Sequence, residues 1–224
     1  MEYEITAQPF PVAIFQLENQ ESIFCEAGGM SWMSDNLSLG TEAGGIGKAF
    51  SRAFSGESMF VNKYTATGGP GEIAIASKFL GTITPIDVNS GESFICQKGA
   101  ILAYTEGIDR KINFRSPLKG LFGGEGFIMQ EVSGSGICFL EIDGEVREYT
   151  LQAGETMILD TGYLLMMDST CSMDVRSVGG LKNTVFGGEG LFNTIVTGPG
   201  KVLVQTSPIH KLAASIARFI PTAK

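Results

Sequence analysis

The amino-acid sequence predicts a mainly β protein built from three copies of one sequence unit and followed by a C-terminal helix. Three observations predict it: sequence elements that recur in the same order, short apolar runs between glycine-rich turns, and a high glycine content. Glycine accounts for 30 of 224 residues, against a usual share of about 7%. Because glycine supplies turns and bulges, which all-β folds need repeatedly, we expect three β-sandwich-like repeats in an approximate threefold arrangement.

The first recurring element is a strand that opens with glutamate, carries an apolar run and ends on glycine. Its copies are residues 21–28, 92–99 and 155–162. The second element is Phe-x-Gly-Glu, and its glutamate follows the first one after 36, 33 and 34 residues. A Gly-x-Gly turn then precedes another apolar strand in each copy, at residues 69–71, 134–136 and 198–200. Matching order and intervals indicate a true internal repeat.

The spacing of these elements predicts one β domain over residues 1–206. Its repeats cover about 15–80, 86–142 and 149–206, with strands at 60–67, 128–133 and 192–197 before the Gly-x-Gly turns. Strand hydrophobicity does not alternate strictly, which favours strands covered on both faces. A short helix is expected within residues 45–54.

Residues 207–224 are predicted to form an amphipathic helix and tail. Ser207 is a suitable N-cap and Pro208 a suitable first helical residue, and Pro221 ends the segment. One face carries an apolar stripe: Ile209, Leu212, Ala213, Ile216 and Ile220.

That stripe needs a cover, which the chain's own sheet, another subunit or a membrane interface would supply. The polar face holds few basic residues, unlike a membrane-surface helix. We therefore expect protein to cover it, with a subunit interface favoured.

The charge and the cysteine pattern exclude several classes of function. A net charge of −8 argues against nucleic-acid binding, which depends on basic side chains. The four cysteines are far apart, without zinc or redox spacing, and we expect reduced thiols. The acidic start at residues 1–4 and the short apolar runs predict no signal peptide and no transmembrane segment, hence a cytoplasmic protein.

No complete catalytic or cofactor motif is present. His210 is the only histidine, and its place outside the repeats favours a surface or packing role over that of a catalytic base. Residues 44–49 resemble a phosphate-binding loop, but Glu42 and Ala49 stand where the P-loop needs glycine and a hydroxyl residue. We expect no enzyme activity, no cofactor and no resident metal.

The repeated carboxylates are the candidates for a cation site. Threefold symmetry could bring Glu57, Glu125 and Glu189 together around a hard cation such as calcium. The neighbouring glycines favour the alternative, in which each glutamate accepts backbone N–H groups in its own turn.

Two basic residues precede each Phe-x-Gly-Glu element. They form either dispersed charge, which we favour, or a positive rim suited to anionic lipid heads or a phosphorylated ligand. The set is Lys48, Arg52, Arg115, Lys119, Arg176 and Lys182.

Two cysteines and the tryptophan have predicted packing roles. Cys25 and Cys96 occupy the repeat position where the third copy has Leu159, so these thiols are expected to pack as small apolar groups. Trp32 is expected to be a core or interface aromatic.

The stretch from Phe50 to Ala66 and the later Phe-Gly-Gly-Glu-Gly copies resemble the family named for the yeast "altered inheritance of mitochondria" protein, over roughly residues 5–206. The resemblance implies a fold similar to tryptophan RNA-binding attenuator protein (TRAP-like) sandwiches and no established enzyme activity. Mitochondrial members are linked to inner-membrane organisation. It supplies no catalytic residues, and likeness of fold does not transfer the attenuator's ligands.

These observations favour a non-enzymatic assembly or scaffold protein that acts as a homo-oligomer. The alternative is a protein that binds a small or anionic ligand in a pocket between repeats. Peripheral contact with a membrane is a further expectation from the resemblance.

Overall fold

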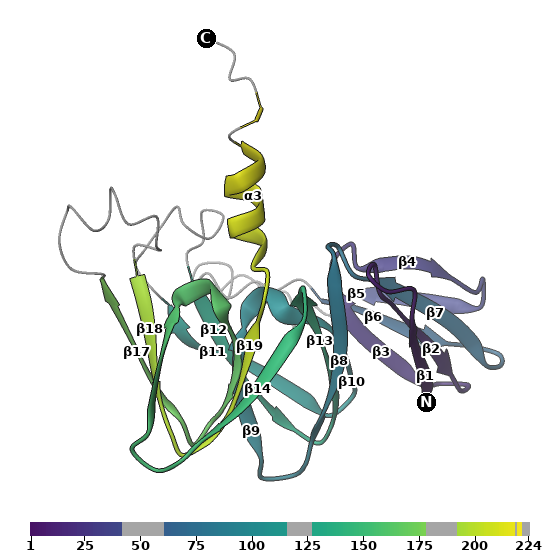
Figure 1. The fold of residues 1–224 in the computed structure, drawn as a ribbon. Helices are drawn as coiled ribbons and strands as arrows, with labels where there is room; N and C mark the ends of the chain where they lie inside the picture. The colour runs from purple at the N-terminus through teal and green to yellow at the C-terminus, as the bar shows by residue number, and fades with distance from the viewer. Residues whose placement is uncertain (42–60, 116–126, 178–191, 218, 221–224) are drawn as a thin grey trace. The chain divides into compact units, whose positions relative to one another are not determined.

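The structure, a computed structural model, is mostly β, with several sheets and one α-helix near the C-terminus (Figure 1). The mainly β class and the C-terminal helix are confirmed. The predicted short helix within 45–54 lies outside the described residues. The structure describes residues 1–41, 61–115, 127–177, 192–217 and 219–220.

Two sheets make the first of two compact units. The unit comprises Met1–Glu92, Gly99–Asp109 and Ser133–Glu141. The first sheet has the order β1 (Glu2–Thr6), β2 (Val12–Leu17), β7 (Gly71–Ala76), β4 (Met30–Met33). The second has the order β5 (Leu37–Thr41), β6 (Val61–Ala66), β3 (Ser22–Glu26), β10 (Ile101–Thr105), β13 (Gly136–Asp143), β8 (Gly81–Val88).

Side chains from both sheets share one core in the first unit. Phe139 on β13 is fully buried, and its ring makes edge-on contacts with the rings of Phe15 on β2 and Tyr3 on β1, at 4.8 and 4.9 Å. Ile23 and Ile73 belong to the same cluster. Two faces that bury a common apolar layer make this unit a β-sandwich.

The second unit is built in the same way. It comprises Ser93–Lys98, Arg110–Val132 and Ile142–Lys224. The third sheet has the order β11 (Ile108–Arg115), β12 (Ile128–Gly134), β9 (Ser93–Gln97), β16 (Leu164–Asp168), β19 (Gly200–Gln205), β14 (Val146–Leu151). The fourth has the order β15 (Thr156–Asp160), β18 (Phe192–Thr197), β17 (Ser172–Ser177). Its core includes Met129, Leu164, Val196 and Val202.

The three strands expected in each repeat are present, but each repeat has further strands. Within the described residues each repeat contributes six strands, β2–β7, β8–β13 and β14–β19. Registers recur as well: β2 pairs with β7 over six residue pairs from Val12–Ala76 to Leu17–Gly71, and β14 pairs with β19 over six equivalent pairs. The approximate threefold arrangement of the repeats stays a prediction.

One turn shows why glycine recurs between strands. Gly134, in the second Gly-x-Gly turn, has a φ of 114°, and a Cβ there would collide with the carbonyl oxygen of Gly107. Only glycine combines this backbone conformation with so close an approach of another chain segment.

The C-terminal helix is shorter than the sequence predicted. The helix α3 covers Ile209–Ala217, so it starts after Pro208 and ends before Ile220. The carbonyl of Pro208 accepts the N–H of Leu212 at 3.3 Å and closes the first turn. In the part of the chain that is described, no helix has the length and apolar character needed to cross a bilayer.

Candidate docking site at the C-terminal helix

The first turn of α3 is fixed to the second unit by three contacts. The N–H of Ile209 donates to Oδ2 of Asp143 at 2.7 Å, and Lys211 forms an ion pair with Asp160. Between them, the imidazole of His210 lies directly against Gly162, where a Cβ would collide with the ring. These contacts define the orientation of the helix where it leaves β19.

Beneath His210 lie two hydrogen-bonded amides, a buried Gln205 and a partly buried Gln97. Gln205 is almost fully buried and donates Nε2–H to the carbonyl oxygen of Gly162 at 2.9 Å. Gln97 donates to the same carbonyl at 3.1 Å and to that of Leu164 at 2.5 Å. Oε1 of Gln205 accepts the N–H of Asp143 at 3.2 Å. The hydrogen-bonded amides thus hold both the glycine that His210 contacts and the aspartate that caps α3.

Burial also sets the charge state of His210. Desolvation lowers the pKa of the imidazole below its usual value; the Asp160 carboxylate opposes this change and the Lys211 ammonium adds to it. The half-buried ring is therefore kept neutral at neutral pH, as a packing group should be. This agrees with the packing role expected from the sequence.

Apolar side chains on α3 and on the residues just after it are exposed. No described residue of the helix is buried. In Figure 1 the helix follows β19 and projects away from the strands of its unit. The exposed fractions are 38% for Leu212, 50% for Ile216, 86% for Phe219 and 60% for Ile220. A helix that is fixed at its start and exposes apolar side chains further along is typical of a docking element.

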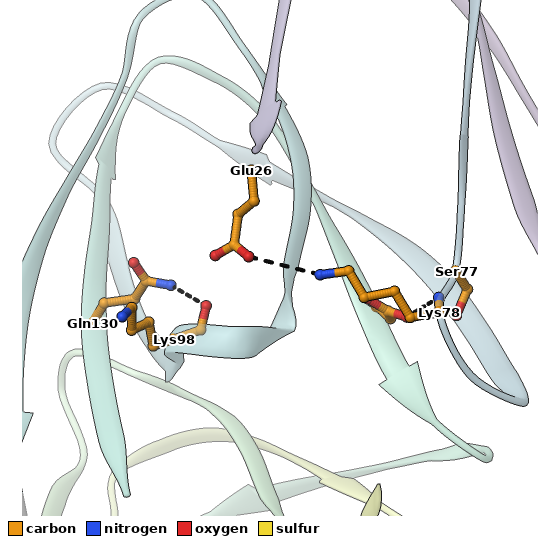
Figure 2. A network of polar contacts seen from close by, with 6 residues as sticks. Glu26, Ser77, Lys78, Lys98 and Gln130 are labelled. Atoms are coloured by element: carbon orange, nitrogen blue, oxygen red, sulfur yellow. Dashed lines mark hydrogen bonds and ion pairs between the residues drawn. The ribbon is translucent and has the colours of Figure 1, made fainter. Parts of the chain in front are cut away.

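In the first unit, carboxylates stand where the second unit has these amides. Glu26 and Glu141 occupy the strand positions of Gln97 and Gln205. Glu141 accepts the hydroxyl of Ser77 at 2.7 Å and the N–H of Lys78 at 2.6 Å, and Nζ of Lys78 lies 3.8 Å from Glu26 (Figure 2). Lys78 thereby compensates charge that the second unit does not carry.

Figure 2 also shows a polar contact of the second unit, between Gln130 and Lys98. The Gln130 side chain is fully buried and donates Nε2–H to the Lys98 carbonyl oxygen at 2.9 Å. It holds β12 to the short 3-10 turn after β9. Lys98 directly follows Gln97, so this contact also fixes the backbone next to the amide that bonds the Gly162 carbonyl.

Most of the candidate ligand-binding residues lie outside the described chain. Glu57, Glu125 and Glu189 do, so their local bonding stays a prediction, as do Lys48, Arg52, Lys119 and Lys182. Arg115 is on β11, and its side chain is not among those described. Arg176 donates Nε–H to Oδ2 of its near neighbour Asp174 at 2.8 Å. Among described residues, no three His, Cys, Asp or Glu side chains are placed to hold a metal ion.

The predictions for the cysteines and for Trp32 have different outcomes. All four cysteines are buried thiols without disulfides, and burial raises the pKa of Cys25 to about 11, with Glu26 adding to the rise. The complete burial of Cys25 confirms that this thiol packs as an apolar group, and a raised pKa disfavours the reactive thiolate. Trp32 is 48% exposed, so the core version of its prediction is wrong and the interface version remains.

The apolar stripe of α3 is visible in the sequence, but the residues that anchor the start of the helix are not. Asp143, Asp160 and Gly162 are far from residue 209 in sequence. The repeat pattern in the sequence identifies Gly162, but it does not indicate that the His210 side chain lies against this glycine.

Known proteins with a similar sequence or structure match along nearly the whole chain. The model of the family described as mitochondrial biogenesis AIM24 matches residues 3–207. An uncharacterised protein from Streptococcus pyogenes serotype M6 is 27% identical over 224 residues, which is 96% of this chain and 88% of the relative. An X-ray crystal structure of a Streptococcus pyogenes protein superposes with a TM-score of 0.81 at 24% identity, covering 98% of this chain and 99% of the other. The structural likeness shows the fold alone.

Proposed function

The chain belongs to the mitochondrial biogenesis AIM24 family, and we propose that it is a non-enzymatic assembly protein whose copies associate. The observation that carries the proposal is α3, whose root is fixed on its own unit while its apolar stripe is uncovered. Leaving Leu212 and Ile216 in water is costly, since burying such a side chain contributes about 1.5–3 kcal/mol. We expect the cover to be a second copy of this chain.

The charges on and near α3 favour protein over an anionic membrane as the cover. Of its two described basic positions, Lys211 is paired with Asp160 and His210 is held neutral by burial. The chain as a whole carries −8. A membrane-surface helix instead presents several lysines or arginines to the headgroups.

The test is a single substitution in the stripe with a matched one on the opposite face. Ile216→Gln keeps a good helix former and removes the apolar contact, whereas Ala214→Gln places the same side chain about 160° around the helix. We expect Ile216→Gln to weaken association about tenfold in light scattering, and Ala214→Gln to leave it unchanged.

Three results would contradict the proposal. A wild-type protein that stays monomeric at every concentration would exclude self-association. Equal effects of the two substitutions would exclude the stripe as the contact. Binding to anionic vesicles by the wild type that Ile216→Gln abolishes would identify a membrane as the cover.

A further inference from the structure

The second and third sheets are each assembled from two different repeats. In the second sheet, β3 of the first repeat pairs antiparallel with β10 of the second repeat. In the third sheet, β9 of the second repeat pairs in the same way with β16 of the third. We call these two strand pairs the junctions.

The junctions share one register. Ala103 lies opposite Cys25 and Tyr104 opposite Phe24 in the first junction; Met166 lies opposite Cys96 and Met167 opposite Ile95 in the second. These positions are equivalent, because 103 and 166 both lie four residues after the recurring glycine. The junction is therefore a reproducible interface between one repeat and the next.

The strand of the first repeat equivalent to β10 and β16 is β4. All three carry a register irregularity at the same position: between Met30 and Trp32 in β4, between Ile101 and Ala103 in β10, and between Leu164 and Met166 in β16. A bulge placed identically in three strands marks them as the same structural element.

The strand equivalent to β3 and β9 in the third repeat is β15. Its register with β18, Thr156–Thr197 to Asp160–Asn193, matches that of β3 with β6, Ser22–Thr65 to Glu26–Val61. Yet β4 ends the first sheet and β15 ends the fourth. Two strands of junction type thus lie at sheet edges within the described chain.

The side chains on these two edges are exposed where their equivalents are buried. Ile158 on β15 is 64% exposed, against 8% and 6% for Phe24 and Ile95. Met33 on β4 is 37% exposed, against 8% and 2% for Tyr104 and Met167. Both strands carry the apolar side chains that their equivalents bury, but no strand of the described residues pairs with these two edges.

The composition of β4 and β15 also indicates that these strands pair with a further strand. Edge strands of monomeric sheets are usually protected from further pairing by charges or proline. Five of the six other end strands in the described sheets contain such residues: β1, β8, β11, β14 and β17. The sequence of β4 is Met-Ser-Trp-Met, and the only charge of β15 is Asp160, which is paired with Lys211.

We propose that β15 of one copy pairs antiparallel with β4 of a second copy and so repeats the junction between chains. The junction register places Trp32 opposite Leu159, Met33 opposite Ile158 and Ser34 opposite Met157. The inference rests on the proposed self-association and adds a second contact between copies to that made by α3. Because the two edges differ, the contact is head-to-tail, and each copy keeps one edge for the next neighbour.

The decisive experiment mixes two variants of the full chain. Met33→Lys places a charge on the β4 edge, and Ile158→Lys places one on the β15 edge; both sites are exposed, so each variant can fold. Tyr149→Lys, on the outer strand β14 and 45% exposed in the wild type, is the matched control. Each edge variant should associate at least about tenfold more weakly than the wild type and the control.

Mixing Met33→Lys with Ile158→Lys should restore association as a capped dimer, because β15 of the first meets β4 of the second. The α3 contact is the same before and after mixing, so any gain reports the sheet edges alone. No gain on mixing would overturn the inference. Pairing of β15 with β4 of the same chain would give this result. Self-association of one edge variant at wild-type strength would also overturn it. Either result leaves the α3 test and the proposed function standing.

A disulfide cross-link checks the register. Met33→Cys mixed with Ile158→Cys should form an interchain disulfide on mild oxidation, since directly opposite residues lie within disulfide reach. Ser34→Cys mixed with Ile158→Cys should not, because successive side chains point to opposite faces. The four native thiols are buried and give little background. Equal cross-linking of both pairs would contradict the register.

Discussion

Gly99 and Gly162 are equivalent residues of the repeat with different surroundings. A Cβ at Gly99 would meet open space, whereas one at Gly162 would collide with the His210 imidazole. The same sequence position therefore tolerates a side chain in one repeat and excludes it in the next. The difference comes from α3, because its His210 ring lies against Gly162 whereas no atom of the described residues lies within 4 Å of a Cβ at Gly99.

Gly162→Ala should consequently displace the root of α3 and destabilise the protein. Overpacking of this kind costs about 1–3 kcal/mol, whereas Gly99→Ala should change stability by less than about 0.5 kcal/mol. Urea unfolding of both variants measures this. In Gly162→Ala/His210→Ala the collision is gone, so the double variant should cost less than the sum of its single substitutions. Additive costs would show that His210 is not the obstacle.

At this scale the sequence could predict residue type better than residue environment. Cys25 is buried as its exchange for Leu159 indicated, because that inference needed only the chemistry shared by equivalent positions. Trp32 could not be placed, since its exposure depends on whether a strand lies beside β4. Pairing across a sheet edge is a long-range property that a local pattern does not contain.

At the scale of elements, α3 depends on its root. Nine residues are too few for a stable isolated helix. Its docking rests on the neutral His210 ring, on Asp160 and Lys211 beside it, and on the bond from Ile209 to Asp143. Anything that charges the ring should weaken the docked state.

The sign of the pH effect follows from the lowered pKa of His210. The undocked ring, with a pKa of about 6.5, binds its proton at a higher pH than the docked ring. Docking is therefore complete above about pH 6.5 and weakens as the pH falls through the lower, docked-state pKa. Hydrogen exchange of the Ile209 amide should accelerate, relative to the intrinsic rate, as the pH falls below about 6.5. In His210→Gln this pH dependence should disappear; its persistence would assign the effect to another group.

The elements themselves were predictable in part. Strands flanked by glutamate and glycine or by Gly-x-Gly turns could be predicted from the sequence, because these flanking residues mark both ends of the strand. Strands such as Met30–Met33 were missed, since four residues without alternation carry no periodic signal. The helix was predicted too long because its apolar stripe continues to Ile220 after the described helix ends. The stripe predicted that a cover is needed, but its exposure required the structure.

At the scale of the whole molecule, the chain alternates between the two units instead of filling one after the other. Three segments of the first unit alternate with three of the second. The strand β13 runs through this division, with Gly136–Glu141 in the first unit and Ile142 and Asp143 in the second. Neither unit is therefore a contiguous piece of sequence that could fold and unfold without moving the other's strands.

We therefore expect both units to unfold in a single transition, and one tryptophan allows a direct test. Trp32 is the only tryptophan and belongs to the first unit, so its fluorescence reports on that unit, while far-ultraviolet circular dichroism reports on all strands.

Met129→Ala removes a fully buried side chain from the core of the second unit and should cost about 2–5 kcal/mol. If β13 couples the units, this substitution should shift the Trp32 transition in denaturant as far as the dichroism transition. Phe139→Ala, in the first core, should likewise move both signals together. A Trp32 transition that Met129→Ala leaves in place, with a separate shifted step in the dichroism, would show that the two units unfold independently.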